Sequence, residues 1–109
     1  MKTTIILTIS TLIAAPLSMR AADAKTNWAN NCAQCHGPTG KGDTKMGKMV
    51  GAMDLTDPKV QAEFTDAKAT QSIKEGVKQN GKTTMKAFGG KLTDDEIKAL
   101  VAYVRTLKK

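Results

Sequence analysis

The composition of this 109-residue chain excludes several kinds of protein. It holds 17 basic and 10 acidic side chains, two cysteines and a single histidine, so two histidines of one chain cannot ligate the same metal. There is also no second cysteine pair to complete a structural zinc site. The length allows one small domain, which would bury only a modest core by itself.

The N-terminal segment has the pattern of a secretory signal peptide. Lys2 gives a positive start, residues 5–17 are mostly apolar, and small residues lie around Ala22 and Ala24. About a dozen apolar residues, interrupted by hydroxyls and a proline, are too short and too polar for a stable membrane span. We therefore expect export to the periplasm and removal of residues 1–24, with cleavage after Ala22 or Ala24.

The most informative motif is Cys32-Ala33-Gln34-Cys35-His36. A first helix is expected from about Ala24 into this motif. On one helical turn the two sulfurs point the same way, so each can form a thioether with a porphyrin vinyl group while His36 reaches the iron. A redox dithiol is the alternative, but a thioredoxin-like protein would need alternating strands and helices, which this sequence lacks. The motif therefore predicts one covalently attached c-type haem, which would also supply the missing core.

The middle of the chain predicts helices joined by long loops, and no segment alternates apolar and polar residues as a sheet would. Residues 37–55 contain five glycines and no helical period, so we expect a loop that runs over the haem edge. Asp57 and the proline after it predict a short helix to about Glu63. Thr65 caps another predicted helix, which ends at Gly76.

The last helix has the clearest signals. Thr93-Asp94-Asp95-Glu96 is a capping box, and Leu92 with Ile97 fits a hydrophobic staple. Apolar residues then recur at helical spacing, at Ile97, Leu100, Val101 and Val104. We expect this face to pack against Trp28 of the first helix, with Tyr103 at the contact.

The ligand on the other side of the iron is less constrained by the sequence. Met85 lies between two predicted helices with glycines on both sides, so its backbone can approach the haem from the face opposite His36. Lysine, water or a small molecule are alternatives. Three further methionines in the loop after the motif are within reach, or serve as apolar filler against the porphyrin: Met46, Met49 and Met53.

Two segments together resemble the small bacterial class I c-type cytochromes, which carry one haem ligated by histidine and methionine. They are Cys32-Ala33-Gln34-Cys35-His36-Gly37, and Met85-Lys86-Ala87-Phe88 followed by Lys91-Leu92-Thr93-Asp94-Asp95-Glu96-Ile97. The resemblance covers nearly the whole chain after the leader. It implies an all-α fold of about four helices and long loops around one covalently attached haem, in a domain over residues 25–109. It also implies that His36 is the proximal and Met85 the distal iron ligand.

Two departures from the family pattern concern the surroundings of these ligands. Lys86 stands where many relatives have a proline directly after the methionine. Many relatives also have a proline about a dozen residues after the histidine, whose carbonyl accepts the imidazole N–H. Positions 46–50 hold no proline, so the hydrogen-bond partner of His36 is unassigned.

The function that this resemblance implies is one-electron transfer, not enzymatic catalysis: a soluble periplasmic carrier between respiratory partners. One alternative is a peroxidase-like haem enzyme or a gas sensor with a displaceable sixth ligand. Such a protein would use a distal histidine or arginine, and Arg105 is the sole arginine after the leader. A cytochrome subunit of a larger oxidoreductase uses the same haem chemistry, so that alternative stays open.

The charge indicates what kind of partner this protein has. Loss of Lys2, Arg20 and Asp23 with the leader changes the net charge from +7 to +6. Because the protein is exported, we expect an acidic redox protein or a membrane-bound respiratory complex as the partner, not nucleic acid, and a monomeric state. Four lysines in the two loops expected to border the haem are candidate docking residues: Lys45, Lys48, Lys82 and Lys86.

Overall fold

The computed structural model describes residue 11 and residues 18–109, with side chains from residue 23 onward in the second range. The predicted leader, residues 1–24, lies largely outside the described residues. The elements in chain order are α1 (Ser18–Asn31), α2 (Ala33–His36), α3 (Lys45–Val50), α4 (Pro58–Ala62), α5 (Asp66–Glu75), β1 (Val77–Gln79), β2 (Lys82–Met85) and α6 (Asp94–Thr106). Within the described residues, no helix is long and apolar enough to cross a membrane.

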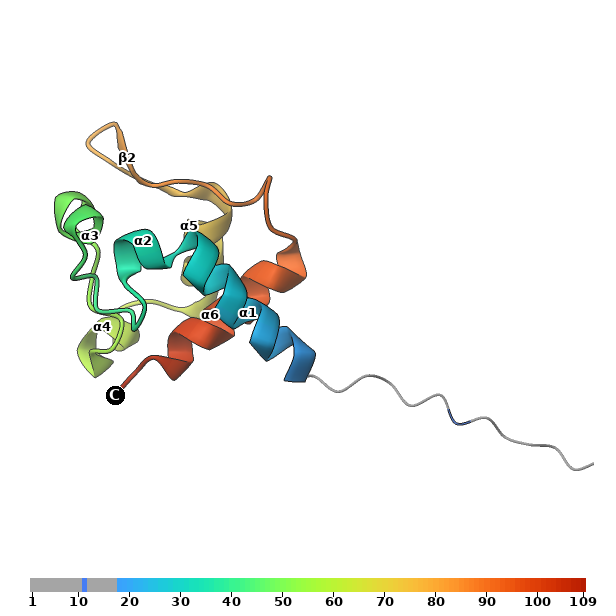
Figure 1. The fold of residues 1–109 in the computed structure, drawn as a ribbon. Helices are drawn as coiled ribbons and strands as arrows, with labels where there is room; N and C mark the ends of the chain where they lie inside the picture. Colours follow the sequence, from blue (N-terminus) through green and yellow to red (C-terminus); the bar gives the residue numbers. More distant parts are fainter. Residues whose placement is uncertain (1–10, 12–17) are drawn as a thin grey trace, which may run out of the picture.

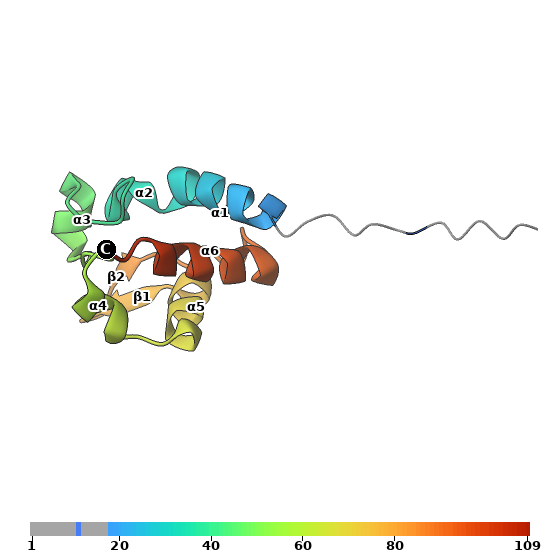
Figure 2. The same cartoon turned by 90° about the horizontal axis from the view of Figure 1, so that it is seen from below.

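Helix α6 runs through the middle of the fold (Figure 1). One layer beside it holds α1, α2 and α3, and the other holds α4, α5 and the β1–β2 hairpin (Figure 2). Contacts of α6 with both α1 and α5 join the two layers. The fold is therefore predominantly helical, as predicted.

The first helix begins at Ser18, earlier than the predicted Ala24, whereas the three predicted starts at Asp57, Thr65 and Thr93 are confirmed. The Asp57 side chain accepts a hydrogen bond from Lys59 N at 2.9 Å, and the Thr65 side chain accepts one from Lys68 N at 3.1 Å. At α6 both halves of the capping box form. Thr93 Oγ1 accepts from Glu96 N and Glu96 Oε1 accepts from Thr93 N, each at 3.1 Å. These caps satisfy backbone N–H groups that a helix start otherwise leaves without partners.

The core lies where the apolar face of α6 meets α1 and α5. Ile97 and Leu100 are fully buried, and Val101 and Val104 are buried beside them. Trp28 and Tyr103 are in ring contact, with centroids 5.6 Å apart, so the predicted packing of the first helix against the last is confirmed.

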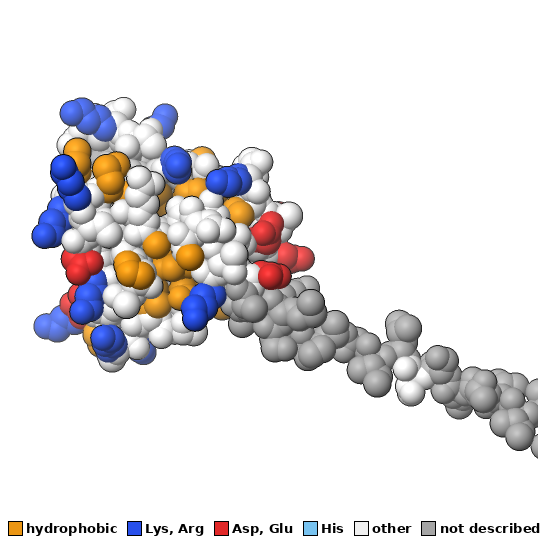
Figure 3. All heavy atoms as spheres, in the orientation of Figure 1, with side chains coloured by type: hydrophobic (Ala, Val, Ile, Leu, Met, Phe, Trp, Pro, Cys, Tyr) orange, Lys and Arg blue, Asp and Glu red, His pale blue; other side chains and the backbone are white. Residues whose placement is uncertain are grey.

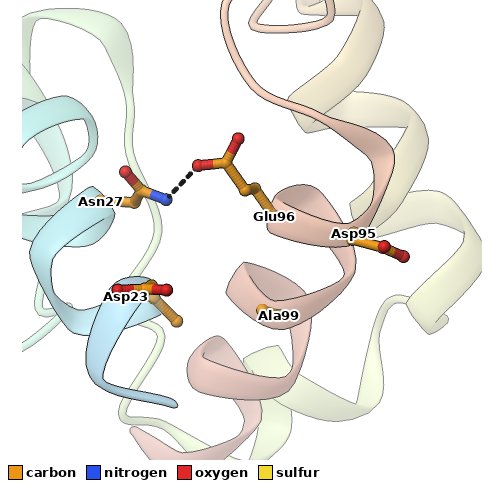
Figure 4. A pocket seen from close by; sticks show the side chains of 6 residues that line it. Asp23, Asn27, Asp95, Glu96 and Ala99 are labelled. Atoms are coloured by element: carbon orange, nitrogen blue, oxygen red, sulfur yellow. Dashed lines mark hydrogen bonds between the residues drawn. The ribbon is translucent and has the colours of Figure 1, made fainter. Parts of the chain in front are cut away.

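Hydrogen bonds also join the helices. Asn27 Nδ2 on α1 donates to Glu96 Oε2 on α6 at 3.0 Å (Figure 4). The hydrogen bond with the Thr93 backbone, followed by this bond with Asn27, lowers the pKa of Glu96. Arg105 donates to Gln61 O, Phe64 O and Asp66 Oδ1, which holds the α4–α5 connection against α6.

Two segments differ from the prediction. Residues 77–85 form a two-stranded antiparallel hairpin where a loop was expected. Asn80 and Gly81 at its tip both have positive φ, and this dipeptide is a strong hairpin signal. The strands have only three and four residues, too few for an alternating pattern to be visible.

The second difference is α3, which lies inside the predicted 37–55 loop. Thr44 caps it, because its side chain accepts from Gly47 N at 2.9 Å. Because this helix has only six residues and a glycine among them, no helical period is recognisable in its sequence. Contacts with α2 stabilise the helix in the folded chain.

Candidate functional site

Cys32, Cys35 and His36 lie on one helical turn at the junction of α1 and α2. Cys32 N donates to Trp28 O at 2.9 Å and His36 N donates to Cys32 O at 3.0 Å, so the backbone stays helical through the motif. Cys32 is buried and Cys35 half-buried, and neither forms a disulfide. Because residues three apart share a helix face, this turn is compatible with both thiols lying on one side.

Burial changes the acidity of the first thiol of the motif. Desolvation, together with the charge of Cys35, raises the pKa of Cys32 to about 11. The Cys32 thiol is therefore protonated at neutral pH. Moreover, the residues that the structure describes contain no cluster of three or more Cys, His, Asp or Glu side chains suited to a metal ion.

The imidazole of His36 is neutral and lies against an aromatic ring. Burial lowers its pKa, and the Trp28 ring centroid is 5.6 Å away. Trp28 Nε1 donates to Gly37 O at 3.1 Å, which fixes the indole beside the end of the motif. A neutral imidazole has a free lone pair for a metal, so the protonation state fits an iron ligand.

One nitrogen of His36 lacks a partner. Nδ1 is buried, and no described residue is within hydrogen-bonding distance of it. The sequence also left this partner unassigned. An unsatisfied buried polar atom costs about 1–3 kcal/mol, and such atoms in native proteins often mark functional positions.

The segment after the motif folds back over it. Thr44 Oγ1 lies 2.8 Å from the carbonyl oxygens of both Gln34 and Cys35. Gly47 of α3 packs so closely on Cys35 O that a side chain would overlap it. Sequence analysis did not single out Thr44 or Gly47; threonine is a preferred N-cap residue, but no Glu or Gln three residues later strengthens that signal here.

Met85 lies at the end of β2, in the layer opposite the one that holds α2 (Figure 2). It is half-buried and packs against the same apolar cluster that includes Cys32. The other three candidate sulfurs are on the surface: Met46, Met49 and Met53 are 41, 71 and 50% exposed. Of the four methionines, Met85 alone is half-buried.

The four candidate docking lysines are all exposed. Lys45 and Lys48 are on α3, Lys82 begins β2 and Lys86 follows it. In Figure 3, basic side chains surround apolar ones on the α3 side of the molecule, and acidic side chains lie both where α6 begins and at the edge below α3. The structure thus places these lysines on both segments that flank the candidate site.

A surface hollow lies elsewhere. It is formed by the middle of α1 and the first turns of α6 (Figure 4), and its lining residues are Asp23, Ala24, Asn27, Asp95, Glu96 and Ala99. None of these belongs to the Cys32–His36 motif or to β2.

Comparison with known proteins gives a consistent result. The family model described as cytochrome c matches residues 21–108. The chain is 36% identical over 87 residues to the Cbb3-type cytochrome c oxidase subunit FixP of Bradyrhizobium diazoefficiens, which covers 80% of the chain but only 27% of FixP. The chain thus spans about a quarter of that relative's length. It is 32% identical to cytochrome c6 of Euglena gracilis, over 72% of the chain and 83% of the relative.

The fold has a counterpart among solved structures. The KustC0563 c-type cytochrome superposes with a TM-score of 0.71 at 36% sequence identity. The match covers 80% of this chain and 99% of that one. Together with the helical architecture, this likeness confirms the predicted small all-α fold.

Proposed function

The chain belongs to the cytochrome c family, and from this premise we propose that it is a periplasmic carrier of single electrons between respiratory partners. The family implies a covalently attached c-type haem, which makes the chain an electron-transfer haem protein. The observation that carries the proposal is the position of two thiols and a half-buried neutral imidazole on one helical turn.

We assign the two thioethers to Cys32 and Cys35 and the proximal iron ligand to His36. When bound, the haem supplies an iron that gains and loses one electron without a bond to substrate being made or broken. The chain does the rest. Thr44 and Gly47 hold α3 against the motif, and Trp28 orients the ring of His36.

Met85 is our assignment for the distal ligand. Support comes from its half-buried position against the core and from its place in the layer opposite α2. A thioether ligand stabilises ferrous iron, so this assignment also predicts a comparatively high reduction potential.

A carrier accounts for the chain better than a peroxidase-like enzyme or gas sensor does. Those functions use a distal histidine or arginine, yet His36 is the single histidine of the chain. Arg105 already donates to Gln61, Phe64 and Asp66 at the α4–α5 connection. Neither side chain is available to act on a bound ligand.

A subunit of a larger oxidoreductase is the second candidate, because one relative is named as an oxidase subunit. Fractionation of native cells separates the two. We expect the haem-staining band in the periplasmic fraction, and gel filtration should give the mass of a monomer. Co-elution with a membrane complex that survives salt washing would favour the subunit.

Covalent attachment is directly testable. Intact-mass analysis in acidified solvent is expected to show the processed chain plus one haem, because thioethers resist extraction. The same mass also reveals whether cleavage follows Ala22 or Ala24. Cys32→Ala should retain haem through one bond, and Cys32→Ala with Cys35→Ala should release it to the solvent. Complete extraction from the unaltered protein would contradict the assignment.

Docking is proposed to involve the four exposed lysines and an acidic partner. Lysines 45 and 48 alternate on α3 with the exposed Met46 and Met49, so charge and apolar surface lie together. Charges of this kind act mainly on the rate of encounter. Electron-transfer rates with an acidic partner are therefore expected to fall as ionic strength rises.

Charge reversal tests this docking surface. Lys45→Glu with Lys86→Glu is expected to flatten the salt dependence while leaving the reduction potential nearly unchanged. The matched control is Lys59→Glu with Lys98→Glu, on the exposed faces of α4 and α6, which changes the net charge equally. Equal effects of the two double variants would show that net charge, not these positions, governs association.

A further inference from the structure

We propose that Gly76 is a positioning residue for Met85, and that the end of α5, not the sequence next to the methionine, fixes where this ligand lies. The proposal rests on the assignment of Met85 as distal ligand. It starts from the residue after Met85, which is Lys86 and therefore places no proline ring on the backbone there. The position of Met85 must then be set by contacts with another element.

Backbone contacts tie the segment after Met85 to the end of α5. Phe88 N donates to Ile73 O at 2.9 Å, and Gly89 N donates to Lys74 O at 3.0 Å. The last carbonyl groups of a helix have no partner within it, so these two bonds satisfy them and dock the segment at once. The side chain of Phe88 is buried in the core cluster, so apolar packing also holds this segment in place.

Gly76 makes the contact nearest to the ligand. It follows the last residue of α5 and has φ of +79°, and its N donates to Ser72 O at 2.9 Å. A Cβ at this position would lie 2.6 Å from Met85 O and 3.0 Å from Ala87 N. Both are backbone atoms, which cannot rotate away as the end of a side chain can. The bare backbone of Gly76 therefore lets β2 lie against the α5 end.

The pairing of the hairpin depends on the same contact. Val77, the next residue, pairs with Met85, and the register is irregular between Val77 and Lys78. A side chain at Gly76 would push Met85 away from α5 at the start of this pairing. Because a ligating sulfur must reach its iron within a narrow distance, a small shift of the backbone weakens the bond.

The hairpin supplies a matched control. Gly81 has φ of +78°, nearly the same as Gly76, but a Cβ there would have no atom within 4 Å. Gly81→Ala thus places an alanine at a similar positive φ without the contact, whereas Gly76 also has ψ of −179°. Gly89→Ala tests the opposite combination, a contact without a strained φ. Its Cβ would lie 2.9 Å from Lys74 O, and its φ is outside the strained range.

The experiment compares holoprotein variants by the weak red absorption band of sulfur-ligated ferric haem, the reduction potential, carbon monoxide binding to the ferrous form, and thermal stability. Gly76→Ala is expected to lose most of the red band, to bind carbon monoxide and to shift its potential toward that of Met85→Ala. Gly81→Ala should keep the band and the potential, even if it melts earlier.

The outcomes separate the two assignments. Loss of the band in Met85→Ala but not in Gly76→Ala would overturn the role of Gly76 and leave Met85 as ligand. A band retained in Met85→Ala would remove the ligand assignment and this inference with it. Equal spectral losses in Gly76→Ala and Gly81→Ala would show that backbone strain, not contact with Met85, causes the loss. That result would also overturn the role of Gly76. Should Gly76→Ala not accumulate, Gly89→Ala decides, because an unchanged band there would contradict control by the α5 end.

Discussion

Met85→Ala is expected to lower the reduction potential by on the order of 0.1 V or more, within the roughly 0.8 V that axial ligands span. The reason is that a sulfur bound to iron stabilises the ferrous state directly, and the alanine variant removes that sulfur. The vacated position should also bind carbon monoxide or imidazole. Potentiometry and ligand titration of the holoprotein measure both effects.

Two surface methionines provide the comparison for this variant. Met49 and Met53 are 71 and 50% exposed, so their alanine variants should change the potential much less than Met85→Ala does. Such side chains influence the haem through packing, if at all. An unchanged potential in Met85→Ala together with a lowered one in either comparison variant would transfer the ligand assignment to the α3 region.

Leu100→Ala is expected to cost about 2–5 kcal/mol of unfolding free energy, because Leu100 is fully buried between α6 and its neighbours. For a domain of this size, that loss corresponds to a fall in Tm of about 10 °C or more. Denaturation in guanidinium chloride and thermal scans measure both quantities. Lys98→Ala, on the exposed face of the same helix, should change the free energy by no more than about 0.5 kcal/mol.

The size of this loss tests how much of the stability comes from the α1–α6 contact. Ile97, Leu100, Trp28 and Tyr103 meet there within the chain itself. If Leu100→Ala lowered the unfolding free energy by less than about 1 kcal/mol, the packing at this contact would be looser than the structure indicates. The haem would then provide most of the cohesion.

Sequence analysis predicted the site best where the chemistry is local. The Cys32–His36 motif needs only helical backbone to bring both sulfurs to one side, and five consecutive residues determine that. The α6 capping box is equally local, because Thr93 and Glu96 satisfy each other within one turn. Such features depend on spacing along the chain, which the sequence states directly.

Elements held by distant contacts were not predictable in this way. Helix α3 has a glycine in its middle and too few residues to be stable alone, so its packing on Cys35 and the Thr44 cap decide that it forms. The β1–β2 hairpin is too short for a visible alternation, and only its Asn80-Gly81 tip carried a signal. In both cases tertiary contacts outweigh weak local preferences.

The sequence by itself determined the attachment motif, the helix caps, the apolar face of α6 and the candidate ligands, because each follows from residue type and spacing. Only the tertiary structure decided that Cys32 is buried with a raised pKa and that Met85 alone among the candidate methionines is half-buried, packed against the core. It also decided that Gly76 lies against the Met85 carbonyl, a contact across nine residues that no local pattern encodes. Burial and close approach depend on which segments meet, and that is settled only when α5, α6 and the hairpin pack together.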